Sequence, residues 1–538
     1  MAEQTFPLRQ SAEIMLALRQ RQEVALVDVR DEALYAGGHP LFAVNIPLSK
    51  LELEVLDRIP RRTTSVTLYD NGEGLAHAAA KRIRALGYQD VALLAGDLNG
   101  WRAAGGEIFI DVNSPAKAFG ELVEHHNRTP SLAAREVEAL LRSQNDVVVL
   151  DARRFDEYQT MNIPGSISVP GAELVLRVED LVSSPETTVI VNCAGRTRSI
   201  IGTQSLINSG IRNPVYALRN GTIGWTLAGL ALEHGQTRRY GETSEAARRR
   251  AAEQARQLAD RAGVQRIDLS QLARWQQQPR TTYLFDVREA QEYAAGHLPG
   301  SRHVPGGQLV QETDHYASVR GARIVLADDD GVRARMTATW LAQMGWEVAV
   351  LEGVEPADFS VRGDWTPQVP ELPATQTVSP AQLAAWLQQG KTQVLDFTSR
   401  ASYLKGHIPG AAWLLRSTLQ QQGKRVLPVA ERYVLTCGSS LLARYAVAQV
   451  AELSGKPVWL LAGGNAAWRI AGLPVESDKQ QLLSPPIDRY RRPYEGTDVD
   501  AATMQAYLEW EYGLVGQLER DGTHNFKVLS PQQEKVTA

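Results

Sequence analysis

Short runs of apolar residues alternate with longer amphipathic stretches along most of the chain. The clearest runs lie at residues 24–30, 66–69, 189–192, 324–327 and 433–436. Runs of this kind are typical of strands that are buried on both faces of a parallel sheet. Residues 200–209 instead place apolar side chains at helical spacing and are followed by Gly210. We therefore expect a helix there, packed on a sheet and ended by the glycine.

The pattern repeats four times. An Asp-x-Arg turn ends the first strand of three copies, at Asp28, Asp151 and Asp286, whereas the fourth copy has Asp396 with its arginine displaced to position 400. From these aspartates to the end of the next apolar strand there are 42, 42, 42 and 41 residues, respectively. Behind each turn come a tyrosine and a turn rich in Gly, His and Pro, and a glycine ends each later helix. Such spacing indicates four copies of one structural unit.

The order of strand, helix and strand predicts the fold class. It is α/β, with each repeat forming a small parallel sheet that has helices on both faces. In open sheets of this kind, ligands bind beyond the carboxyl ends of the strands. One such end is occupied in the four copies by Asp70, Cys193, Asp328 and Cys437. The repeat and the topology thus point to the same position as the candidate site.

The repeats and the segments between them define the predicted domains. The four repeats span residues 1–110, 128–238, 267–366 and 374–478. Residues 239–266 are rich in Ala, Arg and Glu and are expected to form a helical linker, which we interpret as a solvated connector rather than a basic partner-binding helix. Residues 111–130 are polar and are expected to be a loop or short helix. Residues 479–538 form a C-terminal extension with a helical segment near 499–519, whose aromatic side chains are expected to pack on a neighbouring repeat.

Cys193 lies between a predicted strand and the predicted helix that follows it. The next residues form a small, basic turn: Ala194, Gly195, Arg196, Thr197, Arg198 and Ser199. The alternative is an inert core cysteine, since free cysteines are among the most buried residues. Such a cysteine has no need of the basic turn. Free backbone N–H groups, the helix dipole and the two arginines are together expected to lower the thiol pKa and favour thiolate.

Composition narrows the classes of function. The 538 residues carry a net charge of −4, without the basic excess of a nucleic-acid-binding protein. No run of 18 apolar residues and no signal peptide is visible, so we expect a soluble, cytoplasmic protein that does not bind a membrane. The two cysteines are too few for a zinc site or a disulfide framework, although a bond between them is a further alternative.

The order of these motifs resembles that of the rhodanese family. The resemblance rests on Asp-x-Arg, Glu-Tyr, Gly-His-Ile-Pro-Gly, a strand ending in Cys with a short loop, and Gly-Trp, and it covers residues 10–110, 130–235, 267–365 and 376–476. It implies a sulfurtransferase whose loop cysteine takes a sulfane sulfur from thiosulfate or a related donor and holds it as a persulfide. The acceptor would be cyanide, a thiol or a sulfur-accepting protein. No metal or other cofactor is implied.

The resemblance also assigns roles to the loops. Cys193 and Cys437 would be catalytic, and the residues of both loops would bind the donor. The second loop, which resembles the Cys-Gly-Ser-Gly-Val-Thr-Ala loop of mercaptopyruvate sulfurtransferases, contains Gly438, Ser439, Ser440, Leu441, Leu442 and Ala443. Because it lacks arginine, we expect it to take a less charged or bulkier donor, such as 3-mercaptopyruvate. Tandem rhodaneses resemble an inactive domain followed by an active one, and this chain resembles that pair duplicated.

The first and third repeats cannot form a persulfide, because a carboxylate replaces the thiol. Asp70 and Asp328 are followed by further acidic residues, which would repel an anionic donor. These repeats are interpreted either as acceptor-docking or pocket-forming modules or as purely structural ones. The histidines His39, His297 and His407 are expected to stabilise turns rather than act as bases, and the Asp-x-Arg pairs are expected to be structural ion pairs.

Two alternatives to sulfur transfer are kept. Dual-specificity phosphatases of this fold also use a loop cysteine, but their loops place an arginine six residues after it. Here the sixth residue is Ser199 in one loop and Ala443 in the other. The second alternative is a non-catalytic scaffold of rhodanese-like modules, which the two acidic loops favour and the two cysteines oppose.

Overall fold

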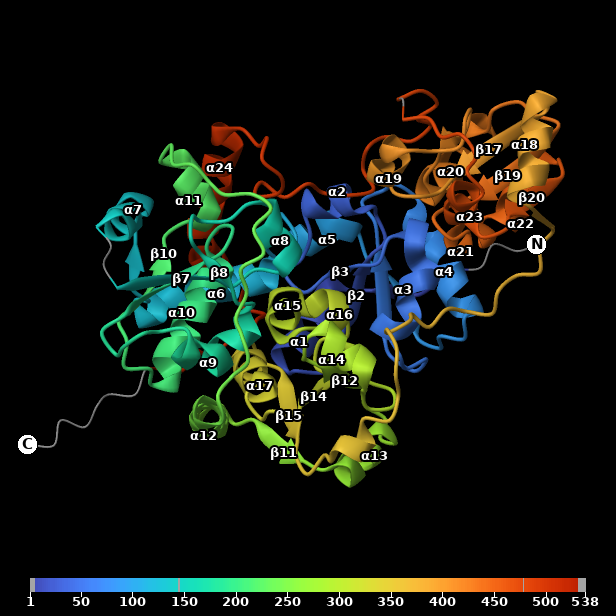
Figure 1. Ribbon diagram of the computed structural model, residues 1–538. Helices are drawn as coiled ribbons and strands as arrows, with labels where there is room; N and C mark the ends of the chain where they lie inside the picture. The colour runs from blue at the N-terminus through green and yellow to red at the C-terminus, as the bar shows by residue number, and fades with distance from the viewer. Residues whose placement is uncertain (1–4, 144–145, 478, 531–538) are drawn as a thin grey trace, which may run out of the picture. The chain divides into compact units, whose positions relative to one another are not determined.

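A computed structural model describes residues 5–143, 146–477 and 479–530 of the protein. It contains four five-stranded sheets, and their pairings are all parallel (Figure 1). The strand order is the same in each sheet: the first strand lies at one edge, followed by the fifth, fourth, second and third. The α/β class and the fourfold repeat are therefore confirmed. Residues 531–538 of the predicted extension lie outside the described residues.

Both faces of the sheets are covered, as the apolar runs predict. Within the strand Arg432–Thr436, Tyr433 and Leu435 join one buried cluster, whereas Val434 joins a second cluster. The strand Thr188–Asn192 divides in the same way, with Val189 on one side and Ile190 on the other. Because successive side chains of a strand point to opposite faces, two clusters on one strand mean two covered faces.

The first and fourth domains belong to one compact unit, which comprises residues up to Glu13, Ala25–Val112 and Pro367–Arg491. The first domain contains β1 (Leu8–Arg9), β2 (Ala25–Asp28), β3 (Val44–Asn45), β4 (Val66–Tyr69) and β5 (Val91–Leu94), with α2 (Glu32–Ala36), α3 (Leu51–Arg58), α4 (Leu75–Ala85) and α5 (Asp97–Ala103). Helix α1 (Ser11–Arg19) follows β1, and from Ile14 onward it is assigned to the other unit. The fourth contains β16 (Thr377–Val378), β17 (Thr392–Asp396), β18 (Ala412–Trp413), β19 (Arg432–Thr436) and β20 (Val458–Leu461), with α18 (Pro380–Gln388), α19 (Arg400–Lys405), α20 (Arg416–Gln422), α21 (Leu441–Arg444), α22 (Val447–Ser454) and α23 (Gly464–Ile470).

The second and third domains form the other unit, together with Ile14–Val24, the rest of Asn113–Thr366 and the chain from Arg492 onward. The second contains β6 (Ser131–Leu132), β7 (Val147–Asp151), β8 (Ile167–Ser168), β9 (Thr188–Asn192) and β10 (Val215–Leu218), with α6 (Ser114–Asn127), α7 (Ala134–Arg142), α8 (Phe155–Thr160), α9 (Leu174–Arg177), α10 (Thr197–Ser209), α11 (Gly221–Leu227) and α12 (Glu245–Ala262). The third contains β11 (Gln265–Ile267), β12 (Thr282–Asp286), β13 (Arg302–His303), β14 (Arg323–Ala327) and β15 (Glu347–Leu351), with α13 (Leu269–Gln276), α14 (Ala290–Ala295), α15 (Gly306–Gln311), α16 (Thr313–Tyr316) and α17 (Arg333–Gln343). The C-terminal extension adds α24 (Ala501–Tyr512) and α25 (Leu514–Asp521).

Each unit thus combines one domain that has a loop cysteine with one that has an acidic loop. The duplicated order along the sequence, an acidic-loop domain followed by a cysteine-loop domain, does not specify spatial partners; here the first domain joins the fourth and the second joins the third. In the first unit Arg416 of the fourth domain donates to Glu52 of the first, at 2.6 Å, and both side chains are largely buried. In the second unit the indole N–H of Trp340 donates to Ser205 at 2.8 Å. The partners are therefore joined by specific buried polar contacts.

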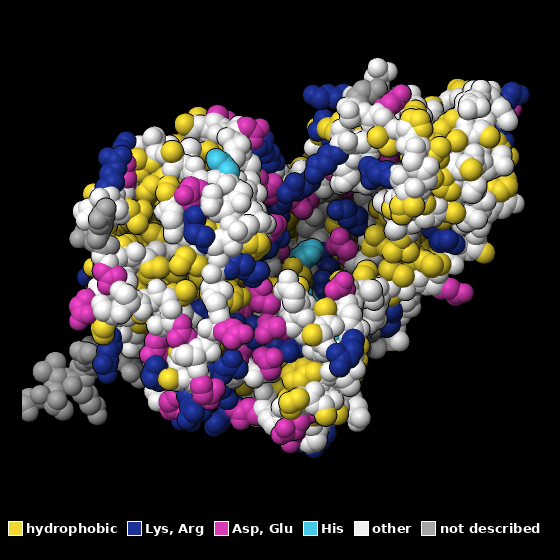
Figure 2. Space-filling model, in the orientation of Figure 1, with side chains coloured by type: hydrophobic (Ala, Val, Ile, Leu, Met, Phe, Trp, Pro, Cys, Tyr) yellow, Lys and Arg dark blue, Asp and Glu magenta, His cyan; other side chains and the backbone are white. Residues whose placement is uncertain are grey.

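Two connecting segments differ from their predicted character. Residues 239–266 do contain a helix, α12, but it is not simply a solvated connector. Ala251, Ala255 and Leu258 are buried in a core cluster of the second domain, while its arginines remain on the outside. Residues 114–127, expected as a polar loop or short helix, form the largely buried helix α6. Charged side chains are otherwise interspersed on the surface that Figure 2 shows, with acidic and basic groups side by side.

Candidate active sites

Cys193 lies where strand β9 ends and helix α10 begins. Its thiol is 2% exposed and lies 3.4 Å from the Ser199 hydroxyl, which donates in turn to the Arg196 carbonyl at 2.8 Å. The carbonyls of Cys193 and Ala194 accept hydrogen bonds from the first turn of α11, through the N–H groups of Thr222 and Ile223, at 2.9 and 3.0 Å. Both loop carbonyls are thereby held away from the thiol. The predicted helix is confirmed, and it ends at Gly210 with φ of 84°.

Arg198 is held beside the thiol by Glu157 of helix α8. The two side chains form a bidentate pair with N–O distances of 2.7 and 2.9 Å. Burial alone would raise the pKa of Glu157, but the Arg198 charge and its hydrogen bonds lower that pKa to about 2. Glu157 is therefore ionised, and it fixes the guanidinium where its charge acts on Cys193.

Arg196 is held by carboxylates of helix α6. Its guanidinium donates to Glu121 at 2.6 and 2.9 Å and also pairs with Glu124, both on helix α6. It also lies 4.3 Å from the ring centroid of Tyr512, on α24. The sequence predicted two arginine charges for a donor, but the guanidinium of Arg196 is bound to carboxylates. Its structural contribution is to tie α6 and α24 to the loop.

The prediction that the surroundings lower the Cys193 pKa is not supported by the structure. Burial raises the pKa of the thiol and outweighs the charge of Arg198 and the hydrogen bonds of Ser199, while Glu511 raises it further. The loop has the expected polar groups, but the side chains around it exclude water. In a fully buried site, desolvation of the anion exceeds the benefit of one paired arginine.

The remaining residues of this loop face its neighbours. Thr197 lies against Gly120 of α6, where a methyl group would come within 2.8 Å of its side chain. Gly195 lies against Tyr507 and Glu511 of helix α24. On the other side of the loop, Thr197 and Arg198 border a cavity of about 40 Å³ that residues of the third domain also line. The whole loop is consequently enclosed by protein.

Cys437 occupies the same position in the fourth domain, between β19 and α21. The carbonyls of Cys437 and Gly438 accept hydrogen bonds from Asn465 and Ala466 at 2.9 and 3.0 Å, as the corresponding carbonyls do at Cys193. Burial raises the pKa of the Cys437 thiol, whereas the backbone N–H groups of Ala443, Leu442 and Ser440 lower it by hydrogen bonding. These N–H groups therefore point at the sulfur.

The second loop is more open than the first. Gly438 and Ser439 are exposed, and Leu441 and Leu442 are half-buried. Ser440 adopts a left-handed conformation, with φ of 67°, which starts the helix directly after it. The predicted apolar and hydroxyl character of this loop is present at its mouth.

The displaced arginine of the fourth repeat has a structural consequence. In the other domains the Asp-x-Arg pairs are buried, with N–O distances of 2.6, 2.8 and 2.7 Å, as expected. Asp396 instead accepts from Asn465 at 2.9 Å and from the N–H of Thr398 at 2.9 Å. Burial raises the pKa of Asp396 to about 6. Arg469 donates to the Gly406 carbonyl, a position that the Asp-x-Arg arginines reach in the other domains.

The two acidic loops show what this position in the fold binds. Asp70 accepts hydrogen bonds from the N–H groups of Gly72, Leu75 and Ala76, at 2.8, 2.5 and 2.8 Å. Asp328 accepts from Gly331 and Ala334 at 3.2 and 2.8 Å. In both domains a carboxyl group thus occupies the place of the thiol and accepts hydrogen bonds from the backbone N–H groups of the loop.

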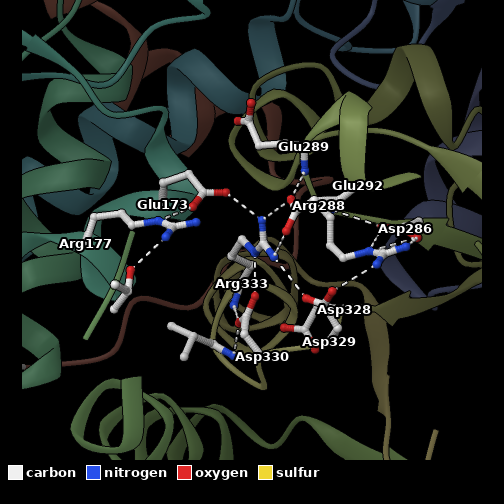
Figure 3. A network of polar contacts seen from close by, with 12 residues as sticks. Glu173, Arg177, Asp286, Arg288, Glu289, Glu292, Asp328, Asp329, Asp330 and Arg333 are labelled. Carbon is white, nitrogen blue, oxygen red and sulfur yellow. Dashed lines mark hydrogen bonds and ion pairs between the residues drawn. The ribbon is translucent and has the colours of Figure 1, made fainter. Parts of the chain in front are cut away.

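The third domain adds a dense polar network around its loop (Figure 3). Arg333 occupies the position of Arg198 and pairs with Glu292, the counterpart of Glu157, at 2.6 and 2.9 Å. It also pairs with Asp330 at 2.5 Å and with Glu173 of the second domain at 2.9 Å. Burial and the neighbouring Asp330 raise the pKa of Asp328 well above its ordinary range. These ion pairs connect the loop of the third domain to the second domain.

The histidine-containing turns that recur in the repeats have the structural role predicted for them. His297 and His407 stack on Tyr293 and Tyr403, with ring centroids 3.7 Å apart in each case, and bond the carbonyls of the same tyrosines. His39 bonds the Pro40 carbonyl at 2.8 Å. The histidine rings thus stabilise the turns, and both cysteines are free thiols rather than disulfide partners.

Sequence reasoning missed two contributors to the Cys193 site. Helix α6 supplies the carboxylates that hold Arg196, and helix α24 of the extension covers Gly195. The Ser-Pro pair at 114–115 is a helix-start signal that could have indicated α6. For α24, Tyr507 and Leu508 join a cluster with Ile223 of the second domain, as the aromatic composition suggested in general terms. No signal in the sequence identified the loop as the partner.

Comparison with known proteins places the chain in a family. The rhodanese-like domain matches residues 11–104, 133–228, 268–353 and 379–471, and the chain belongs to this family. A crystal structure of thiosulfate sulfurtransferase from Pseudomonas aeruginosa is 65% identical, with a TM-score of 0.96, over 97% of this chain and 100% of that chain.

Curated relatives match over shorter stretches. The HTH-type transcriptional regulator Rv0324 of Mycobacterium tuberculosis is 30% identical over 115 residues, which are 21% of this chain and 50% of that protein. The uncharacterized protein slr1261 of Synechocystis sp. is 34% identical over 88 residues, 16% of this chain and 48% of that protein. The chain thus spans about half the length of these curated relatives. In the described part of the chain, no helix has the length and apolar character needed to cross a membrane.

Proposed function

We infer that the protein is a sulfurtransferase that carries a sulfane sulfur as a persulfide on Cys193 and Cys437. The acceptor is thiophilic: cyanide, a thiol or a protein. The loop residues 194–199 and 438–443 form the donor-binding loops, with Arg198 supplying the charge beside Cys193 and Arg196 holding the first loop through Glu121. The predicted domain boundaries are consistent with the four sheets and the four family matches.

The observation that carries this proposal is the carboxylate of Asp70 in its loop. Because it accepts three backbone N–H groups where the second and fourth domains have sulfur, the loop is a ready-made cradle for an anion. In the cysteine-containing domains the anion is a thiolate before the reaction and a persulfide after it. The same N–H groups stabilise both, so the loop supports both half-reactions.

The chemistry follows from this geometry. The thiolate electron pair attacks the outer sulfur of the donor, a sulfur–sulfur bond forms, and the bond to the leaving group breaks with its electron pair. With thiosulfate the leaving group is sulfite. A nucleophilic acceptor then removes the outer sulfur and regenerates the thiolate. Sulfur moves without an external oxidant or reductant, so this chain's residues need only bind, orient and handle protons.

Thiosulfate is the donor that we assign to the Cys193 site. The support is the name of the 65% identical Pseudomonas protein and the position of Arg198 beside the thiol. For the Cys437 site we propose a less charged or bulkier donor of the 3-mercaptopyruvate kind, because the loop presents hydroxyls and leucines. A cytoplasmic location fits two thiols that are both free.

The two alternatives are not favoured. Helix α10 begins at Thr197, and Arg198 is bound by Glu157, so the loop lacks the free arginine at the sixth position that a phosphate-binding loop uses. A pure scaffold would not need two thiols in register at the ends of corresponding strands. Sulfur transfer accounts for both features.

The proposal is tested by incubating the protein with thiosulfate, 3-mercaptopyruvate or glutathione persulfide and measuring its intact mass. We expect a gain of one sulfur atom at each reactive cysteine, removed again by cyanide. Absence of any sulfur gain with all three donors would refute the proposal. Peptide mapping after alkylation assigns each added sulfur to its loop.

A further inference from the structure

Helix α24 of the C-terminal extension places a buried carboxyl group against the Cys193 loop. Tyr507 and Glu511 lie on one face of this helix and point at Gly195, two residues beyond the thiol. A Cβ atom on Gly195 would lie 3.2 Å from the Tyr507 ring and 3.4 Å from Glu511 Oε2. Both side chains therefore pack directly against the backbone of the loop at Gly195.

One oxygen of this carboxyl group lacks a hydrogen-bond partner. Glu511 is fully buried, and the Tyr507 hydroxyl donates to its Oε1 at 2.8 Å. Its Oε2 is buried without a hydrogen-bond partner among the described residues. Buried polar atoms are nearly always paired, because an unpaired one costs free energy. An unpaired carboxyl oxygen that faces a nucleophile's loop is therefore available for a reacting group.

The charges around Glu511 keep it able to accept or release a proton. Burial, together with the charge of Glu121 of α6, raises its pKa to about 8. Lys117 of α6, the Tyr507 hydroxyl and Arg196 of the loop oppose this increase. The charge of Glu511 in turn raises the pKa of Cys193. The two groups are thus electrostatically linked, and the ionisation of one opposes that of the other.

We propose that Glu511 is the proton-exchange group of the Cys193 site, taking the thiol proton and passing it to the leaving group of the sulfur donor. This inference rests on the proposed sulfurtransferase function and specifies how one of its two sites works. The buried thiol needs such a group, because burial disfavours the thiolate that attacks the donor. A neighbouring carboxylate that becomes neutral as the thiolate forms keeps the net charge of the enclosed site constant.

The balanced step has three parts. The Cys193 S–H bond breaks, and the proton moves to a carboxylate oxygen of Glu511. The thiolate pair then forms a bond to the outer sulfur of thiosulfate, while the bond to sulfite breaks and sulfite keeps the electron pair. Glu511 finally gives its proton to sulfite. Cys–SH and S₂O₃²⁻ are thereby converted to Cys–S–S⁻ and HSO₃⁻, with Glu511 returned to its starting state.

The test uses the full chain with Cys437→Ser, so that added sulfur reports only on Cys193. In this background we compare Glu511→Gln with Glu509→Gln, the same substitution at an exposed position of the same helix. Persulfide formation from thiosulfate is followed in single turnovers by quenched intact mass, between pH 5 and 9. We expect Glu511→Gln to lower the maximal rate about 100-fold at pH 7, a typical contribution of acid–base catalysis. The donor concentration for half-maximal rate should change less than about threefold, since the loop itself is intact.

The pH profile distinguishes proton exchange from a structural role. With Glu511 present, the rate should rise with pH until the carboxyl group is ionised, near its pKa of about 8. With Glu511→Gln, the rate should increase only at higher pH, where the Cys193 thiol itself ionises. Tyr507→Phe removes the hydrogen bond that lowers the Glu511 pKa. The inflection of the rate–pH profile should therefore move to higher pH, although the carboxyl group is still present.

The possible outcomes separate this inference from the function on which it rests. If Glu511→Gln reacts within threefold of Glu509→Gln and both keep the same pH profile, the proton-exchange role is wrong while sulfur transfer stands. If Glu511→Gln does not fold, the rate–pH profile of Tyr507→Phe is used instead. An inflection at the same pH as in the protein with native Tyr507 would overturn the proton-exchange role of Glu511. If Cys437→Ser with native Glu511 gains no sulfur from any donor, the proposed function fails at Cys193 and the inference fails with it.

Discussion

The two cysteine loops share one backbone design and differ in what surrounds them. At Cys193 every loop residue except the half-buried Arg198 is buried, and helices α6 and α24 lie against the loop. At Cys437, Gly438 and Ser439 of the loop are exposed, and the sulfur interacts mainly with backbone N–H groups. The comparison indicates that the repeated fold supplies the cradle, while at Cys193 the helices α6 and α24, outside the repeat, cover the loop and add charged groups beside it.

The sharpest test of this comparison is to remove each thiol separately. Cys193→Ser and Cys437→Ser should each abolish sulfur gain on their own loop and leave the other loop active, because each cradle is complete within its own domain. The donor profiles should differ, with thiosulfate used mainly at Cys193 and less charged donors mainly at Cys437. Persulfide mapping with the three donors provides the measurement. Loss of persulfide on both loops in either variant would instead indicate a relay between them.

The second difference concerns the buried aspartate behind each loop. Asp396 has a folded pKa of about 6, above the ordinary value of about 3.9, whereas Asp151 has its arginine partner. Because the folded state then binds more protons, this group's contribution to stability is complete below about pH 4 and is lost as pH rises through 6. Asp396→Asn should abolish this decrease in the free energy of unfolding between pH 4 and 7. The decrease is about 3 kcal/mol, at 1.4 kcal/mol per pKa unit.

This effect is measured as the free energy of unfolding of the first unit against denaturant at pH 4, 5, 6 and 7. Glu452→Gln, at an exposed carboxylate of the fourth domain, serves as the control. Equal pH slopes for wild type and Asp396→Asn would mean that Asn465 and Arg469 fully replace the missing arginine partner. The proposed difference between the two domains would then be wrong.

A third prediction separates the two arginines of the first loop. Arg198→Gln should lower the rate of persulfide formation at Cys193 about tenfold with thiosulfate, because its charge lowers the pKa of the thiol. Arg196→Gln should mainly lower stability, because it leaves the buried Glu121 without its partner. Single-turnover rates and thermal unfolding of both variants test this division of roles. A larger catalytic effect from Arg196 at unchanged stability would reverse the assignment.

The smallest expected effect is on thiol accessibility. Iodoacetamide should modify Cys437 several-fold faster than Cys193 at pH 8, since the Gly438–Ser439 segment is exposed and the Cys193 loop is covered by α24. Both thiols have pKa values raised by burial, so access rather than ionisation should decide the ratio. Peptide mapping during the reaction gives both rates. Equal rates would show that α24 does not protect its loop.

Local features of this protein could be predicted from its sequence. The strand ends, the loop positions and the helix ended by Gly210 follow from short-range patterns, and the turn histidines follow from repetition. The pKa direction at Cys193 could not be predicted, because it depends on burial by α24, more than 300 residues away. The partner of Arg196 was equally hidden, since α6 looks polar in isolation and is buried only by tertiary packing.

The pairing of domains in space could not be predicted from the sequence, for a related reason. Four similar repeats have similar surfaces, and the period says nothing about which surface meets which. The choice depends on individual side chains, such as Arg416 facing Glu52 and Arg333 facing Glu173. Such charges look like ordinary surface residues until their partners are known.

The pairing of the first domain with the fourth also bears on how the chain is made. Glu52 and its buried partner Arg416 are 364 residues apart, so the first domain leaves the ribosome long before its partner exists. At about 5–20 residues per second, that interval is roughly 20–70 seconds. During it the carboxylates of Asp31 and Glu52 remain hydrated, and the domain must persist as a solitary folding unit. The second and third domains are contiguous and can join within a much shorter interval, so assembly from the inside outward is the order that synthesis imposes.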